Sequence, residues 1–308
     1  MNKAEEANFL RHGKEATTMY TILTDSCSDL NPQILRQFDR VAVLPMSYTL
    51  AGETSTKPFD DAKTVHAYYD RLRAGETCTT AQISPDTFCE AFRAFAKQGE
   101  PVLGILFSSA LSGTYNAACL ARSMVLEEYP DAVIELVDSL AASAGEGLLV
   151  YDALKNREAG MSLADNAQWV RDNALHLVHW FTVDDLHFLK RGGRCSPSAA
   201  FFGSMLSIKP VLHVDNEGRL IARQKVRGRQ QALRALAAKY GELSDEQDQM
   251  IFISHGDCEE DALTVKRHLV ESFGCDPEKI VLSVIGPVIG SHSGPGTVAL
   301  FFHGKDRG

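Results

Sequence analysis

An apolar run that passes directly into hydroxyl-rich residues is the feature that most constrains this chain. Residues 101–107 (PVLGILF) have the composition of a buried strand, and residues 108–115 (SSALSGTY) lead from it into an alanine-rich segment of helical period. A strand followed at once by a helix is typical of α/β proteins. The unpaired N–H groups and the positive dipole end of a helix N-terminus favour anions. This junction therefore predicts a site for a carboxylate or phosphate group.

Apolar runs alternate with segments of helical period through the first half of the chain. Strands are expected at residues 21–23, 41–44, 102–107 and 133–137, and helices at residues 62–72, 86–96, 114–126 and 163–173. Polar residues follow three of these strands, at 24–26, 108–109 and 138–139. Because the carboxyl ends of parallel strands share one edge of a sheet, we expect a single polar crevice there. The expected fold is α/β, with an N-terminal α/β/α layer domain around a mainly parallel sheet.

The pattern changes near residue 175, where we place a domain boundary. Beyond it, strands are expected at residues 177–182, 208–214, 220–225, 250–253, 281–285 and 297–302, with helices at 230–240 and 260–273. Residues 215–218 (DNEG) are typical of a hairpin turn in which Gly218 supplies a positive φ. The expected organisation is an N-terminal extension (1–18), an α/β domain (19–175) and a C-terminal α/β domain with a mixed sheet (176–308).

Composition excludes several classes of protein. The chain has 308 residues, 44% hydrophobic and 23% charged, as in an ordinary globular protein of about two domains. Its seven cysteines are odd in number and form no C-x-x-C pair, which argues against a disulfide framework or a zinc knuckle and for a reducing cytoplasm. No stretch approaches the roughly 18 apolar residues of a membrane span, and residues 1–18 lack the apolar core of a signal peptide.

Charge is distributed unevenly along the chain. The net charge is −9, but residues 186–229 contain nine Lys or Arg against Asp215 and Glu217, so this segment carries +7 and the remainder −16. An acidic chain repels nucleic acid as a whole, whereas a local basic segment suits an anionic ligand or an acidic partner protein. A solvated surface of uneven charge is the alternative interpretation.

Three further segments carry residues suited to an anion. Residues 79–82 (TTAQ) are expected to form a polar loop before a helix capped by Ser84 and Pro85, and helix entry alone is the alternative. Residues 285–296 contain four glycines around His292, which indicates a loop with a tight backbone path rather than an isolated surface histidine. Residues 190–194 (KRGGR) place guanidinium groups after a short helix, where cations complement the helix dipole and also match a carboxylate or phosphate.

Several catalytic signatures are missing from the sequence. It contains neither G-x-x-x-x-G-K-[ST] nor G-x-G-x-x-G, and the Gly pair around Glu146 is a weak signal, so direct nucleotide binding is not supported. No serine lies in a G-x-S-x-G elbow. Ser109, His292 and Asp138 have the residue types of a catalytic triad, but nothing in their spacing requires one.

Eight of these segments form a pattern when they are taken in chain order. They are residues 24–30 (TDSCSDL), 79–82, 108–115, 138–139, 183–194, 209–210 (KP), 225–228 (KVRG) and the segment around His292. Together they resemble the DegV family from about Tyr20 to the C-terminus. The resemblance implies a bacterial fatty-acid-binding protein, similar to the binding subunits of fatty acid kinase. Such a protein encloses a long-chain fatty acid and presents its carboxylate to a separate ATP-dependent kinase, which forms an acyl phosphate for phospholipid synthesis. The binding subunit has no catalytic nucleophile and no cofactor.

The resemblance also implies roles for individual residues. The residues that it assigns to the carboxylate are Thr80, Ser112, Arg194 and His292, and Arg227 is expected to face the kinase. Thr79 and Arg191 are the alternatives to Thr80 and Arg194. The chain departs from the commoner pattern at Ala81, Ile83, Cys195 and Ser293. None of these departures removes a proposed contact with the carboxylate.

Three functions follow from these observations. As a fatty-acid carrier, the chain would bury about sixteen methylenes at roughly 0.8 kcal/mol each, a gross gain of about 13 kcal/mol before ordering costs. Apolar residues of both halves are expected to line the tunnel, including Phe201, Phe202, Met205 and Leu206. The first alternative is a serine hydrolase of acyl esters or phosphoesters, acting through Ser109 or Ser112 with His292. The second is a phosphosugar-binding module that uses the same helix N-terminus.

Overall fold

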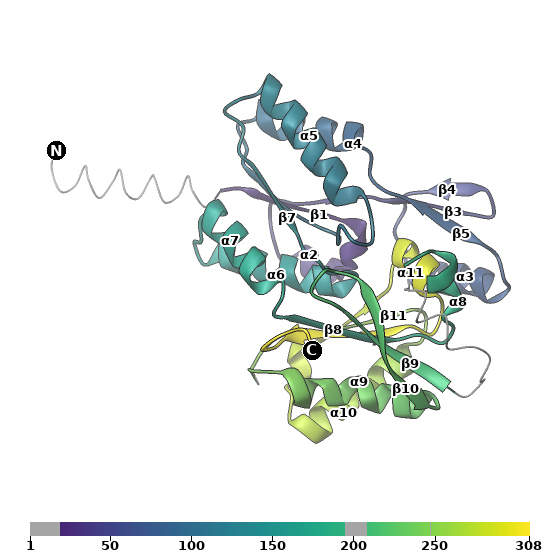
Figure 1. Ribbon diagram of the computed structural model, residues 1–308. Helices are drawn as coiled ribbons and strands as arrows, with labels where there is room; N and C mark the ends of the chain where they lie inside the picture. The colour runs from purple at the N-terminus through teal and green to yellow at the C-terminus, as the bar shows by residue number, and fades with distance from the viewer. Residues whose placement is uncertain (1–18, 195–207, 247) are drawn as a thin grey trace.

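The structure, a computed structural model, describes residues 19–194, 208–246 and 248–308. The N-terminal extension, Cys195 and the expected tunnel residues Phe201, Phe202, Met205 and Leu206 lie outside the described residues. The described residues form two large β-sheets and one small sheet, with helices packed between and around them (Figure 1). Among residues 19–194, 208–246 and 248–308, no helix has the length and apolarity that crossing a bilayer requires.

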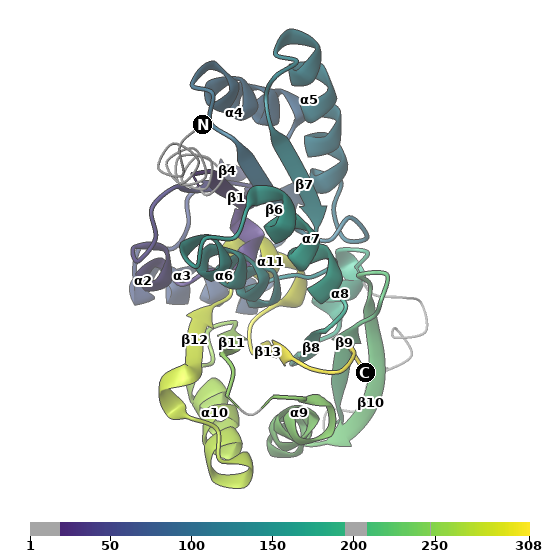
Figure 2. The ribbon, with the colours of Figure 1, turned by 90° about the vertical axis from the view of Figure 1, so that its left-hand side faces the viewer.

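A four-stranded parallel sheet forms the centre of the N-terminal part. Its order is β2 (Val41–Leu44), β1 (Thr21–Asp25), β6 (Val102–Leu106) and β7 (Ile134–Asp138). Strands β1 and β6 are buried along their whole length, as expected for apolar strands covered on both faces. Helices α4 (Pro85–Lys97) and α5 (Thr114–Glu128) cover one face, and α6 (Ala144–Glu158) and α7 (Leu163–Asn173) cover the other (Figures 1 and 2).

A six-stranded mixed sheet forms the C-terminal part. Its order is β10 (Leu220–Arg227), β9 (Ile208–Val214), β8 (Leu177–Thr182), β13 (Val298–His303), β11 (Ile251–His255) and β12 (Ile280–Val284). The β11–β12 pair is parallel, and the other neighbouring pairs are antiparallel. Helices α9 (Arg229–Leu243) and α10 (Glu259–Phe273) pack on the face away from the parallel sheet (Figure 1). The predicted fold class is confirmed, while the boundary near residue 175 stays a prediction.

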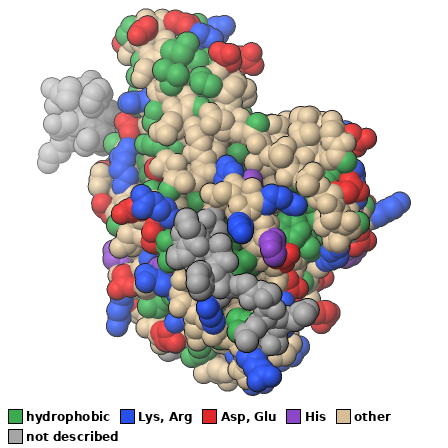
Figure 3. Space-filling model, turned by 45° about the vertical axis from the view of Figure 1, so that its right-hand side comes forward, with side chains coloured by type: hydrophobic (Ala, Val, Ile, Leu, Met, Phe, Trp, Pro, Cys, Tyr) green, Lys and Arg blue, Asp and Glu red, His purple; other side chains and the backbone are tan. Residues whose placement is uncertain are grey.

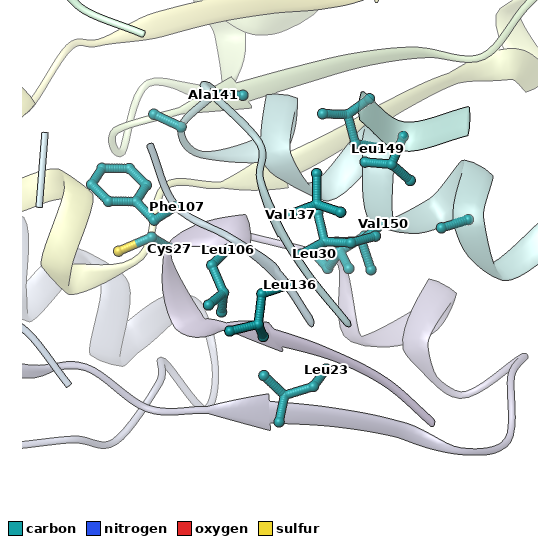
Figure 4. Close-up of a cluster of buried hydrophobic side chains, with 14 of the residues drawn as sticks. Leu23, Cys27, Leu30, Leu106, Phe107, Leu136, Val137, Ala141, Leu149 and Val150 are labelled. Atoms are coloured by element: carbon teal, nitrogen blue, oxygen red, sulfur yellow. The ribbon is translucent and has the colours of Figure 1, made fainter. Parts of the chain in front are cut away.

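Helix α6 lies between the two large sheets and contacts strands of both (Figure 1). Two glycines permit this close packing. A Cβ at Gly145 would lie 2.8 Å from the Phe301 ring, and one at Gly147 would lie 2.5 Å from the Ser28 carbonyl oxygen. One hydrophobic core therefore includes side chains from both parts of the chain. Figure 4 shows part of this core, where Val137 of β7 lies close to Leu149 and Val150 of α6.

A small antiparallel sheet corrects one sequence prediction. Its order is β4 (Glu53–Ser55), β3 (Ser47–Leu50) and β5 (Cys78–Ala81). Helix α3 (Ala62–Arg73) packs against it through Tyr68, Tyr69 and Leu72. The prediction of a loop at residues 79–82 was wrong, because Thr79, Thr80 and Ala81 belong to β5. These strands are short and polar, so their sequences show little β-propensity. Pairing with neighbouring strands is what stabilises them.

The predicted hairpin turn joins β9 to β10, and Gly218 has φ +76. Ser108 Oγ donates to the Gly218 carbonyl oxygen at 2.9 Å, so this hydroxyl holds the turn against the N-terminal part. A side chain at position 218 would collide with Ser108, because its Cβ would lie 2.2 Å from Ser108 Oγ. Glycine is therefore required at this position both by the turn and by the contact.

Arg307 binds the same turn through its side chain. Its buried guanidinium donates to the carbonyl oxygens of Ala174 (2.5 and 3.0 Å), Leu140 (2.5 Å) and Asp215 (3.0 Å). Burial lowers the pKa of Arg307 to about 10. Asp215 begins the hairpin turn, whereas Leu140 and Ala174 follow β7 and α7. One side chain therefore joins the end of the chain to the turn and to two segments of the N-terminal part.

Candidate ligand-binding site

A cavity of about 240 Å³ lies where the two parts of the chain meet. Much of its wall is apolar and includes Met46, Phe107, Leu111, Phe181, Leu220 and Val288. The wall also includes Thr80, Ser112, Arg194 and His292. The structure thus brings together the four residues that the sequence analysis assigned to a carboxylate, although they come from four separate segments.

Thr80 and His292 form the polar centre of this wall. Thr80 Oγ1 lies 2.8 Å from His292 Nε2. Side chains alternate along a strand, so Thr80 of β5 points to the cavity while Thr79 is exposed. Of the two threonines that the sequence left open, Thr80 is therefore the one that lines the cavity.

His292 belongs to a short helix, α11 (Pro287–Ser293), so the prediction of an irregular glycine-rich loop was wrong for this part. Helix α3 fixes α11, because the hydroxyls of Tyr68 and Tyr69 donate to the carbonyl oxygens of Pro287 (2.7 Å) and Ile285 (2.8 Å). Burial lowers the pKa of His292 to about 4, and the nearby charges of Arg194 and Arg191 contribute. The imidazole is therefore neutral near pH 7.

Arg194 follows α8 (His187–Arg191) and brings a positive charge to the cavity. Its Nε donates to the Leu111 carbonyl oxygen at 3.1 Å, and its Nη1 donates to the Gly192 carbonyl oxygen at 2.5 Å. These bonds hold the guanidinium beside the turn that precedes α5. Arg191 instead stacks over the Phe188 ring, 5.0 Å from its centroid, and lines a separate surface groove. Arg194 is therefore the better placed of the two arginines.

Ser112 lies in the turn between β6 and α5, as the strand-to-helix junction predicts. Its hydroxyl accepts from the Thr114 N–H at 3.3 Å and lies 3.0 Å from Thr114 Oγ1. Gly113 is the N-cap of α5 and has no side chain of its own to accept from the helix N–H groups. The Ser112 hydroxyl and the positive end of α5 therefore face the cavity beside Arg194.

The polar ends of the parallel strands do not form the crevice that the sequence analysis expected. Asp25 accepts from the Phe107 and Cys27 N–H groups at 3.0 and 2.9 Å, and Asp138 accepts from the Ser109 N–H at 3.1 Å. Asp25 and Asp138 thus bind backbone N–H groups and do not line the cavity. The catalytic triad considered from the sequence, Ser109, His292 and Asp138, does not form either. His292 pairs with Thr80, and neither Ser109 nor Asp138 lines the cavity.

A buried set of carboxyl groups was missed by sequence reasoning. Asp29 accepts from Ser143 Oγ at 2.5 Å and from the Gly286 N–H at 2.8 Å, which joins the segment after β1 to the start of α6 and to the segment before α11. Burial raises the pKa of Asp29 to about 7 and that of Asp25 to about 6, and it raises the pKa of Glu146 well above its usual value. Because Gly286 is 257 residues from Asp29, no local pattern reveals this network.

We expect the protonated Asp29 to stabilise the fold, so that the free energy of unfolding falls as pH rises. Its folded pKa is about 7 against a usual value of 3.8, so the folded state holds the proton more tightly and loses this advantage as pH rises toward 7. Between pH 5 and pH 7 the contribution falls by about 2 kcal/mol. Urea unfolding at both pH values should show a smaller pH-dependent loss for Asp29→Asn than for the wild type. Equal losses would contradict this assignment, and Asp276→Asn, at an exposed carboxyl, is the control.

Comparison with known proteins identifies the family of this chain. A family model described as "Uncharacterised protein, DegV family COG1307" matches residues 19–305. The chain belongs to the DegV family. A DegV domain-containing protein of Clostridium perfringens is 42% identical over 290 residues, which cover 94% of this chain and 98% of that protein.

Solved DegV structures share the fold. A DegV family protein from Thermus thermophilus, described by its fatty acid binding, is 29% identical, with a TM-score of 0.80 over 93% of this chain and 99% of that one. The Streptococcus pneumoniae fatty acid kinase B3 protein, loaded with linoleic acid, is 21% identical, with a TM-score of 0.79 over 92% of this chain and 99% of that one. At that identity the similarity concerns the fold.

Proposed function

We propose that this DegV protein binds a long-chain fatty acid in the cavity and holds its carboxylate with Thr80, Ser112, Arg194 and His292. The observation that carries the proposal is the gathering of these four side chains at one place in an otherwise largely apolar wall. An acyl chain gains roughly 0.8 kcal/mol per buried methylene, while a few aimed donors fix its polar end. The similarity to the fatty-acid-binding Thermus thermophilus protein supports the proposal.

Each of the four groups has a distinct part in holding the carboxylate. Arg194 supplies the positive charge, and its hydrogen bonds to Leu111 and Gly192 fix its position before the ligand arrives. The hydroxyls of Thr80 and Ser112 donate to the oxygens. The neutral imidazole of His292 orients Thr80. Hydrogen bonds to a charged acceptor are stronger than neutral ones, so this arrangement selects an acid over an ester.

The proposal is tested by native mass spectrometry of protein purified from bacterial cells. We expect an added mass that matches a fatty acid, and lipid extraction should then identify its chain length. Apo protein that takes up no added fatty acid would contradict the proposal. Hydrolysis of activated esters that Ser112→Ala abolishes would instead favour the serine hydrolase alternative.

We further infer that the bound carboxylate is presented to a separate ATP-dependent kinase, which forms an acyl phosphate in the bacterial cytoplasm for phospholipid synthesis. In this proposal the DegV protein binds and presents the acid without a catalytic residue of its own. Its support is the basic segment around β10, where Arg227 is exposed at the end of the strand. Figure 3 shows Lys and Arg side chains across the middle and lower part of one face. Such a face suits an acidic partner surface.

Arg227→Ala should therefore separate binding from phosphorylation. We expect an unchanged fatty acid Kd, because Arg227 is exposed and does not line the cavity, and at least about a ten-fold lower rate of acyl phosphate formation with the partner kinase. The control is Arg267→Ala, which removes an exposed arginine from α10 on the other side of the mixed sheet. Equal loss of binding and phosphorylation in Arg227→Ala, or an equal rate loss in Arg267→Ala, would refute the assignment.

A further inference from the structure

His179 is a polar residue in the apolar part of the cavity wall. It lies on β8, is 3% exposed, and lines the cavity together with Phe181. Its ring centroid lies 4.5 Å from that of Phe301 and 5.9 Å from that of Phe181. Its Nδ1 is buried and has no hydrogen-bond partner. Burial lowers the pKa of His179 well below 6.5, so the ring is neutral.

An unpartnered imidazole is an unfavourable choice for a wall that contacts hydrocarbon alone. Buried polar groups are nearly always hydrogen-bonded, and one without a partner loses its hydration without compensation. A phenyl ring of similar size would fill the space between Phe181 and Phe301 without that cost. The histidine is therefore better explained by a ligand that brings a polar atom to this depth.

A second polar residue, Ser143, lines the same cavity. Ser143 precedes the first turn of α6, lines the cavity, and has the strained backbone angle φ +54. Its hydroxyl donates to Asp29 Oδ2 at 2.5 Å and lies 2.9 Å from Ser254 Oγ. His179 faces the same turn, because a Cβ on Gly145 would lie 3.5 Å from His179 Nδ1. Residues of β8 and of the start of α6 thus bring polar groups to the wall of the same cavity.

We propose that this place, formed by His179 and Ser143, binds an oxygen atom carried along the acyl chain, so that the ligand is a hydroxylated or oxo fatty acid. The inference rests on the proposed function and refines it. His179 Nδ1 has no partner, and the hydrogen bonds of Ser143 involve none of the four carboxylate-binding residues. The carboxylate and the chain oxygen are therefore bound at separate points, and the distance between them selects the position of the oxygen.

The test is a positional series of monohydroxylated octadecanoic acids, each competed against octadecanoic acid. We expect the wild type to prefer one position of the hydroxyl over the plain acid by about ten-fold, since one satisfied hydrogen bond in a buried site is of that order. His179→Phe should abolish the preference while binding of plain octadecanoic acid is kept or improved. Phe181→Leu, a change on the same strand that leaves the polar groups in place, should keep the preference.

The outcomes separate this inference from the proposed function. If the wild type binds octadecanoic acid but prefers no hydroxylated isomer, the inference fails while the proposed function stands. A preference that survives in His179→Phe overturns it as well. If the wild type binds neither acid, the proposed function itself fails. The wild-type series tests the inference even if the variant does not fold. An oxygenated lipid that copurifies with the protein would support the inference directly.

Discussion

Arg307→Ala is expected to lower the free energy of unfolding by about 3 kcal/mol or more. The substitution leaves buried carbonyl oxygens of Ala174, Leu140 and Asp215 without their donor. It also frees the turn between β9 and β10, so Leu220 of the cavity wall loses a fixed position. Urea unfolding of purified protein measures the loss, and fatty acid retention measured alongside should fall as the wall loosens.

Arg219→Ala is the matched control for this prediction. Arg219 lies on the same hairpin, but its side chain is 62% exposed and pairs with the equally exposed Glu217. Such a pair contributes at most about 1 kcal/mol. A similar loss in both variants, or an unchanged unfolding curve for Arg307→Ala, would show that the buried guanidinium does not hold these segments together.

The double substitution Thr80→Val, Ser112→Ala is expected to raise the fatty acid Kd on the order of 100-fold. Both changes remove a hydroxyl that faces the carboxylate while nearly preserving side-chain volume, and each hydrogen bond to a charged group is worth about 1.5–3 kcal/mol. Displacement of a fluorescent fatty acid measures the effect. The apolar wall is unchanged, so we expect some residual affinity from the chain.

Strand alternation supplies the control for this second prediction. Thr79→Val makes the same chemical change one residue away, on the exposed side of β5. We expect its Kd to stay within about two-fold of the wild type, because the side chain does not reach the cavity. Full affinity in the double variant, or equal loss in Thr79→Val, would move the carboxylate away from the place assigned to it.

The elements with a clear apolar period were predicted well. The strands from Thr21, Val102 and Leu177 and the helices from Ala62, Thr114 and Leu163 lie where the sequence placed them. Helix α6 was missed, because it is packed between two sheets, buries residues in both directions and so lacks an amphipathic signal. Strands β3, β4 and β5 were missed because their stability comes from pairing with one another.

Some residues of the candidate site could be predicted from the sequence and others could not. Segments rich in glycine, hydroxyl groups or cations contain the residues Thr80, Ser112, Arg194 and His292. These segments could be recognised from the sequence alone. The pairing of Thr80 with His292 and the exposure of Thr79 depend on β5, which the sequence did not predict. Asp29, Ser143 and His179 contact residues far away in the chain, and no spacing rule could have selected them.

The position of α6 has a consequence for how the chain acquires its structure. Its residues are covered on one side by strands that precede it and on the other by strands of which the last, β13, ends at His303. A nascent chain that has emerged as far as Glu158 would therefore expose an apolar helix to water until the last strand is made. The two parts should consequently melt in a single calorimetric transition, because the core that they share is lost when either part unfolds.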